Sequence, residues 1–223
     1  MKNLAPGVWR LKQVPGPVVN VYLAEDVLID AGARLDRRRI FSELLGREIS
    51  LLALTHVHPD HQGCAKAIRE ELGVPLACHR DDVDAMEGRR PVQEAAPSHP
   101  FNVLSRKAFE GPPCEVDRPL VDGDEVAGFR VVHTPGNSRG HVVYFREPDR
   151  VAICGDVVRN MSYLTGLPGI KEPPDFFTPD PAENRRSIRK LAALEPSLLL
   201  PGHGPPITDM AAFQRFAASL PVD

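Results

Sequence analysis

Three histidines and one aspartate lie within residues 56–61, which read His-Val-His-Pro-Asp-His. Alternate residues of an extended segment face the same side, so His56 and His58 are predicted to point together. Asp60 and His61 follow at the turn and can close over the same point. Imidazole nitrogens and carboxylate oxygens bind borderline cations such as zinc. The spacing therefore predicts a metal site, and the alternative is a solvated polar turn that happens to be rich in histidine.

The residues on either side indicate how this cluster is held. Residues 49–54 form an apolar run of strand length, and residues 62–72 read as a helix that ends at Gly73. The cluster is therefore predicted to occupy a strand-to-helix turn, where a rigid scaffold can fix the direction of each side chain.

Other predicted strands also end in a polar residue beside glycine or proline. Asp30, Asp156 and His203 stand at such ends, and residues 135–137 read Pro-Gly-Asn. Glycine and proline suit sharp turns that expose the neighbouring side chain. Each residue alone could be an ordinary cap or turn residue. Together they add a second carboxylate and a fourth imidazole, which is enough for two metals that share one bridging carboxylate.

The rest of the pattern alternates β-prone runs with amphipathic helices. Strands are predicted over 8–11, 18–23, 27–30, 74–78, 129–134, 142–145, 150–154 and 198–200, and helices over 34–45, 81–86, 181–194 and 211–220. This order predicts an α/β fold with mixed sheets in a single domain, residues 1–223.

Two segments carry more specific expectations. Residues 88–119 contain many prolines and few periodic apolar residues, so they are predicted to form an irregular insertion. This insertion could be a lid over the histidine cluster or a surface excursion. In the helix over 34–45, one buried stripe is predicted to hold Leu35, Ile40, Phe41, Leu44 and Leu45.

Composition limits the function classes. The chain has 223 residues and a net charge of −3, with its basic residues scattered, which argues against nucleic-acid or anionic-membrane partners. No apolar run approaches the length of about 18 residues that spans a bilayer, and the N-terminus has no signal-peptide core. The 4 cysteines are far apart. We therefore expect a cytoplasmic protein with free thiols, and a homodimer stays open.

The motifs occur in an order that resembles the metallo-β-lactamase superfamily. They are residues 56–61, Thr134-Pro135-Gly136, Gly155-Asp156 and Pro201-Gly202-His203-Gly204. The resemblance covers nearly the whole chain. It implies a four-layer αββα sandwich of two mixed β-sheets flanked by helices, with two divalent metal ions at one edge of the sheets.

The resemblance also implies a role for each site residue. The first metal would be held by His56 and His58, and the second by Asp60, His61 and His203. Asp156 would bridge the two metals. Asp30 would steady the histidine-rich turn from behind the ligands.

One position departs from the family pattern. The usual element is Thr-Pro-Gly-His-x-x-Gly-His, and its first histidine completes the first metal site. This chain has Asn137 there and His141 at the second histidine. An amide oxygen is a harder and weaker donor than imidazole. The first site is therefore predicted to be weakened and partly occupied, unless His141 or His133 substitutes. His133 is the less favoured substitute, because it reads as a packed strand residue.

The implied reaction is hydrolysis by metal-activated water of a thioester, ester or lactone in a small molecule. Asp60 would orient the nucleophile. Family members of this size resemble hydroxyacylglutathione hydrolases. Zinc fits the ligands best, and manganese or iron would also fit. Arg159, Tyr163 and Lys171 could bind an anionic group of the substrate or could be solvated surface.

Two rival functions share the fold. An iron-dependent redox enzyme of the persulfide dioxygenase type would depend on the first metal site, where this chain has lost a histidine. A non-catalytic binding module is supported by Asn137, but the other ligand positions are intact and argue against it.

Overall fold

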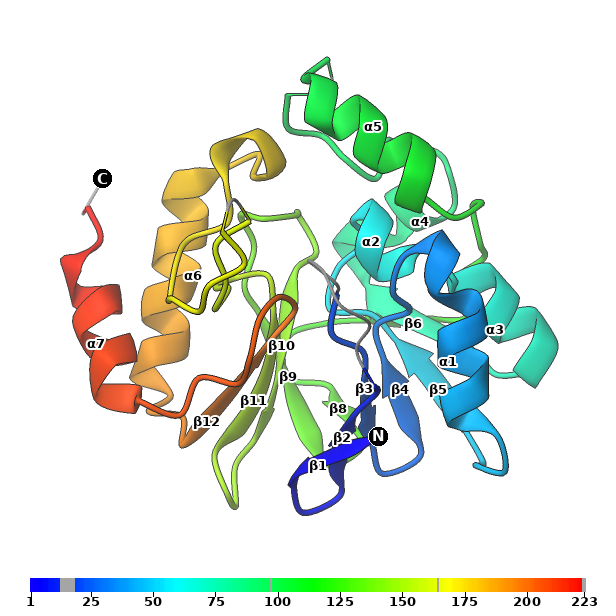
Figure 1. Cartoon of the computed structure of the whole chain (residues 1–223), viewed down its shortest axis with the longest axis horizontal. Coiled ribbons are helices and arrows are strands. Elements are labelled where there is room, and N and C mark those ends of the chain that lie inside the picture. The colour runs from blue at the N-terminus through cyan, green and yellow to red at the C-terminus, as the bar shows by residue number, and fades with distance from the viewer. Residues whose placement is uncertain (13–18, 97, 164, 222–223) are drawn as a thin grey trace.

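Two β-sheets face each other and are flanked by helices in the computed structural model, which describes residues 1–12, 19–96, 98–163 and 165–221 (Figure 1). The first sheet contains, in spatial order, β1 (Lys2–Ala5), β2 (Val8–Arg10), β3 (Tyr22–Ala24), β4 (Val27–Ile29), β5 (Leu51–Ala53), β6 (Leu76–His79) and β7 (Arg118–Leu120). Neighbours from β1 to β4 are antiparallel, and neighbours from β4 to β7 are parallel. This sheet is therefore mixed.

The second sheet is mixed as well. Its spatial order is β12 (Leu198–Pro201), β11 (Val151–Gly155), β10 (Val142–Arg146), β9 (Phe129–His133) and β8 (Glu125–Val126). β11 and β12 are parallel, and the other neighbours are antiparallel.

Helices cover the outer face of each sheet. The helices are α1 (Arg37–Leu44), α2 (Pro59–Gln62), α3 (Ala65–Leu72), α4 (Val83–Met86), α5 (Pro100–Phe109), α6 (Pro181–Ala193) and α7 (Met210–Ser219), with 3-10 turns η1 (Arg34–Asp36), η2 (Arg80–Asp82) and η3 (Asp175–Phe177). α6 and α7 pack on the second sheet, and α1 and α3 pack on the first (Figure 1).

Each interface between layers has its own apolar core. Tyr22, Tyr144 and Ile153 are buried between the two sheets. Ile40 is buried under the first sheet's helices, and Phe213 under those of the second. Burial of such side chains stabilises a fold by roughly 1.5–3 kcal/mol each. The four-layer αββα sandwich with mixed sheets is therefore confirmed.

The predicted helix over 34–45 is shorter than expected. It begins as the η1 turn, and α1 ends at Leu44. Leu35 lies in that turn and is 73% exposed, and Leu45 lies beyond the helix and is 81% exposed. The prediction that these two leucines join the buried stripe was wrong, because α1 includes neither of them.

The prediction that residues 88–119 are irregular was also wrong in part. α5 lies within them, and β7 begins in them. α5 begins with Pro100 at its first turn, where proline is well tolerated. Its buried residues are Asn102 and Ser105, so the apolar periodicity that marks most helices is absent. The described residues also include no helix with the length and apolar character needed to cross a membrane.

A contact between distant parts of the chain holds the loop after β12. Asn20 Nδ2 donates hydrogen bonds to the carbonyl oxygens of Pro201 and Gly204, both at 2.8 Å. The Tyr22 hydroxyl donates to the Pro201 carbonyl at 2.7 Å. The loop between these two carbonyls carries His203, so the first sheet helps to position a residue that follows the second.

Candidate metal centre

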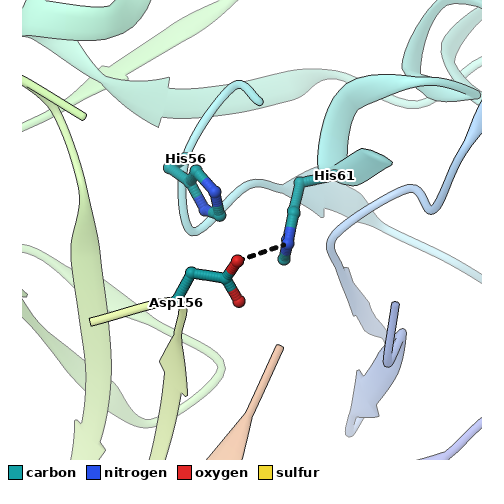
Figure 2. A group of neighbouring side chains, drawn as sticks. All are labelled: His56, His61 and Asp156. Carbon is teal, nitrogen blue, oxygen red and sulfur yellow. Dashed lines mark ion pairs between the residues drawn. The ribbon is translucent and has the colours of Figure 1, made fainter. Parts of the chain in front are cut away.

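The predicted ligands converge at one end of the two sheets. Ligand atoms of His56, His61 and Asp156 lie within 4.8 Å of one another, and the same holds for Asp60, His61 and His203. Figure 2 shows the side chains of His56, His61 and Asp156 pointing toward one another. Because His61 belongs to both groups, the two groups form one continuous set.

We call this set the metal cradle. We define its second half as Asp60, His61 and His203, and its first half as His56 together with the predicted positions His58 and Asn137, which lie outside both tight groups. Asp156, which belongs to the group of His56 and His61, is treated separately.

Asp156 is the centre of the metal cradle. One of its carboxylate oxygens lies 3.6 Å from His61 Nε2 and 3.3 Å from His203 Nε2. His203 Nε2 also lies 3.2 Å from an Asp60 oxygen. Asp156 follows β11 directly, and its neighbour Gly155 has a φ of +48°. That left-handed backbone suits glycine and turns the carboxylate toward the imidazoles.

Asp30 orients both halves from behind. It directly follows β4 with a φ of +65° and is buried. Its carboxylate accepts a hydrogen bond from His61 Nδ1 at 2.9 Å and one from the Thr55 backbone N–H at 2.7 Å. The Thr55 hydroxyl also lies 3.1 Å from His56 Nδ1. The Nε2 atoms of His56 and His61 are thereby left facing the metal cradle, as expected for supported metal ligands.

His58 stands slightly apart. Its ring meets the His56 ring at 4.6 Å between centroids, at nearly a right angle, and its side chain is buried. It is not a member of either tight ligand group among the described residues.

Unpaired buried atoms support the fit of a cation to this set. The buried atoms without a hydrogen-bond partner include His56 Nε2, His61 Nε2, His203 Nδ1, Asp156 Oδ1 and Asn137 Oδ1. Buried polar atoms are normally paired because an unpaired one costs about 1–3 kcal/mol. A cation bound among these side chains would give several of these atoms a partner.

Asn137 and His141 differ in whether a side-chain atom remains without a hydrogen-bond partner. Asn137 is buried, and its Nδ2 lies 3.5 Å from the Thr178 hydroxyl while Oδ1 is unpaired. His141 uses both ring nitrogens: Nδ1 lies 2.9 Å from the Thr134 hydroxyl, and Nε2 accepts the Asp156 backbone N–H at 3.0 Å. His141 therefore supports Asp156, and Asn137 keeps a free oxygen.

His133 does not join the metal cradle. Its ring stacks on His79 at 4.0 Å between centroids with 11° between planes, and its Nε2 lies 2.8 Å from the Arg139 carbonyl. Asp81 lies close to both rings. Two parallel rings cannot both aim a lone pair at one ion, so we interpret this cluster as packing.

The two halves differ in protonation when no cation is bound. Burial lowers the pKa of His56, and lowers that of His58 to about 4, so both are neutral. Burial also opposes charge on His203, but Asp156 and Asp60 outweigh it and raise the pKa of His203 to about 9. Asp156 and Asp30 likewise outweigh burial and raise the pKa of His61.

Gly202 is required by close approach. A Cβ at this position would lie 2.2 Å from Asp156 Oδ1 and 2.7 Å from His61 Cε1. Any side chain here would displace the carboxylate at the centre of the metal cradle.

The predicted substrate residues have other partners. Arg159 stacks on the Tyr163 ring at 4.4 Å and donates to the carbonyl oxygens of Glu172 and Met161. Tyr163 meets the His203 ring at 5.2 Å. The Lys171 side chain is exposed, and its backbone pairs with that of Arg159. Of the three, Tyr163 lies at the metal cradle.

The sequence interpretation missed the residues that orient the ligands through hydroxyl groups. Thr55 and Thr134 are buried and bind His56 and His141 respectively. Thr55 directly precedes His56, and Thr134 is the first residue of the Thr-Pro-Gly motif; these positions are the only signal of this role in the sequence.

Comparison with known proteins identifies the family. The metallo-beta-lactamase superfamily profile matches residues 14–203, and the chain belongs to this superfamily of metal-binding hydrolases. A probable metallo-hydrolase of Bacillus subtilis, YflN, is 31% identical over 201 residues, which cover 82% of this chain and 76% of that protein.

Solved structures agree on the fold. The metallo-beta-lactamase family protein TTHA1429 of Thermus thermophilus has a TM-score of 0.72 and 27% identity, covering 97% of this chain and 80% of that one. The protein TTHA1623, described in a di-iron-bound form, has a TM-score of 0.64 and 28% identity, covering 90% and 94%.

Two more distant relatives carry named activities. A hydroxyacylglutathione hydrolase of Rhodospirillum rubrum is 27% identical, covering 63% of this chain and 42% of that protein. An acyl-coenzyme A thioesterase of Gallus gallus, MBLAC2, is 29% identical, covering 75% and 68%.

Proposed function

We propose that this protein is a metal-dependent hydrolase that cleaves a thioester, or a related ester or lactone, in a small molecule. The observation that carries the proposal is the set of buried, unpaired ligand atoms around Asp156. The thioester preference is supported by the named activities of the two distant relatives. We further propose that the protein acts in the cytoplasm, and that a homodimer is compatible with this activity.

The proposed ligands follow the two halves of the metal cradle. His56, His58 and Asn137 would hold one ion, Asp60, His61 and His203 would hold the other, and Asp156 would contact both. Imidazole and carboxylate donors favour zinc, with manganese or iron as alternatives. When bound, such ions lower the pKa of water so that hydroxide is available at neutral pH.

The side chains would then have separate tasks. Asp60 is partly exposed beside His203 and would accept a hydrogen bond from the attacking water. Asp30 keeps a proton on His61 Nδ1, so that Nε2 carries the lone pair needed by a ligand. His141 holds the Asp156 backbone, so that its carboxylate keeps its direction.

Metal analysis combined with a substrate panel tests this proposal. The purified chain should take up zinc, manganese or iron, and the loaded protein should hydrolyse at least one thioester, ester or lactone. Asp156→Asn should lose metal at both positions and lose turnover. Asp26→Asn is the matched control, because Asp26 lies in the exposed turn between β3 and β4. A chain that binds no transition metal, or an Asp156→Asn variant with unchanged turnover, contradicts the proposal.

A further inference from the structure

A row of aromatic side chains leads from the metal cradle to the solvent. The ring of Tyr163 meets that of His203 edge-on at 5.2 Å, and it meets Phe177 at 6.5 Å. Phe177 in turn meets Phe101 at 5.5 Å. Phe101 lies on α5 and is 48% exposed. A surface of rings therefore begins at a proposed metal ligand and ends at the outside of the molecule.

Two segments distant in the sequence build the outer end of this row. Phe176 and Phe177 belong to η3, Phe101 lies in the first turn of α5, and His99 directly precedes α5. His99 stacks on Phe176 at 4.6 Å with 11° between planes, and Phe101 meets Phe176 at 5.9 Å. α5 also contacts α2, the helix that carries Asp60 and His61, and both lie at the same end of the molecule (Figure 1).

Buried amides fix these two segments to each other. Asn102 Nδ2 donates to the carbonyl oxygens of Ala95, Ala96 and Phe176, at 3.0, 3.1 and 2.6 Å. Gln93 Nε2 donates to the Phe177 carbonyl at 3.3 Å. These bonds hold the rings in place before any ligand arrives, which reduces the ordering cost of binding.

The one guanidinium described in contact with this row, that of Arg159, is bonded to the protein backbone. It lies over the Tyr163 ring and donates hydrogen bonds to the backbone carbonyls of Glu172 and Met161. It therefore supports the ring wall, and the wall itself presents apolar faces and edges. Leu104 lies one turn after Phe101 on α5 and is 64% exposed, which extends the apolar surface.

Building on the hydrolase function proposed above, we propose that this row of rings binds the acyl group of the substrate and selects a long apolar acyl chain. The reacting carbonyl would lie at the metal cradle, and the chain would extend along Tyr163 and Phe177 toward Phe101. Burial of each methylene against the rings favours the longer substrate, by about two- to fourfold in kcat/KM per methylene.

The test uses the full chain loaded with metal and thioesters of one thiol, N-acetylcysteamine, with straight acyl groups from acetyl to decanoyl. We expect kcat/KM to rise with chain length. Phe101→Ala should reduce the rise per methylene, and Phe101→Leu should restore most of it. Leu45→Ala is the matched control, because it removes an exposed apolar side chain that lies 81% exposed just after α1, and it should leave the rise unchanged.

A second measurement does not depend on turnover. Equilibrium binding of a dansyl-labelled undecanoic acid should weaken several-fold in Phe101→Ala and not in Leu45→Ala. If thioesters are hydrolysed but kcat/KM is independent of chain length, the acyl proposal is overturned while the hydrolase function stands. If no thioester, ester or lactone is hydrolysed, the hydrolase function fails. If, in addition, Phe101→Ala binds the labelled acid as tightly as the unaltered protein does, the acyl site is overturned as well.

Discussion

The two halves of the metal cradle are built from similar residues but are held differently. In the second half, His61 and His203 each face at least one carboxylate, which raises their pKa values. Both imidazoles are therefore in the positively charged form when no cation is bound. In the first half, His56 and His58 are neutral, and the remaining position is an amide. In the second half, protons on the imidazoles supply the positive charge that a metal would otherwise bring. In the first half, each neutral imidazole already has a nitrogen lone pair available.

This difference teaches that the number of ligands alone does not describe such a centre. The carboxylates that strengthen the second half also raise the cost of removing its protons. The first half needs no proton to leave, but its amide is the weaker donor. Affinity at the two positions should therefore respond differently to pH and to substitution.

After Asp156→Asn, the largest effect is expected from Asp30→Asn. An amide here would turn an N–H toward His61 Nδ1 or leave the Thr55 groups with a poorer acceptor. Loss of such support typically lowers metal affinity about 10–100-fold. Competition with a chelator should show this loss mainly in the second half, and Asp26→Asn should show none. Equal losses in both halves would mean that Asp30 acts on the whole centre through Thr55.

Asn137→His should have the next largest effect, in the opposite direction. A third imidazole should raise affinity in the first half by about tenfold, equivalent to ~1.4 kcal/mol. Anomalous scattering at each position, recorded at limiting metal, would report this change in occupancy directly. If occupancy of the first half stays the same, the asparagine is not responsible for its weakness.

The pH dependence should distinguish the halves without mutation. The pKa of His203 is about 9 in the metal-free fold, above its usual 6.5, so its ion pairs stabilise that fold fully below pH 6.5 and are lost as pH rises through about 9. Metal affinity of the second half should rise over the same interval, because deprotonation no longer opposes binding. Calorimetry at pH 7.5 in two buffers of different ionisation enthalpy should detect proton release for the second half and little for the first. Equal release from both halves would contradict the difference in protonation.

The smallest effect is expected from His141→Ala. This imidazole touches Asp156 only through the backbone N–H, so both metals should stay bound, with a loss of affinity of less than about tenfold. Metal content after gel filtration measures this. Complete loss of the metal in the first half alone would show that His141 is a ligand there after all.

The sequence was most informative where residues able to bind a metal also occur in the order of the family's motifs. His56, His58, Asp60, His61, Asp156 and His203 were predicted from motif order, and the structure brings them to one end of the sheets. Asp30 was predicted to steady the histidine-rich turn, and its carboxylate contacts His61 and Thr55. Apolar runs were sufficient to predict an α/β fold with mixed sheets, and the four-layer sandwich followed from the resemblance to the superfamily.

What could not be predicted depends on contacts between distant segments. α5 was missed because its buried face is made of Asn102 and Ser105, whose partners lie in other loops. The position of His141 suggested a substitute ligand, and only its contacts with Thr134 and Asp156 revealed that both nitrogens are used. The row of rings depends on the contact between Phe101 and Phe177, and the sequence around neither residue indicates that contact.

The hydrogen bonds from Asn20 and Tyr22 to the loop that carries His203 have a consequence for biosynthesis. The first strands leave the ribosome long before that loop, because the carbonyl acceptors lie about 180 residues after the amide and hydroxyl donors. A nascent chain that stops before Pro201 has no His203 and lacks the brace for it. Tight capture of a cation in the second half should therefore begin only after residues 201–204 have been synthesised.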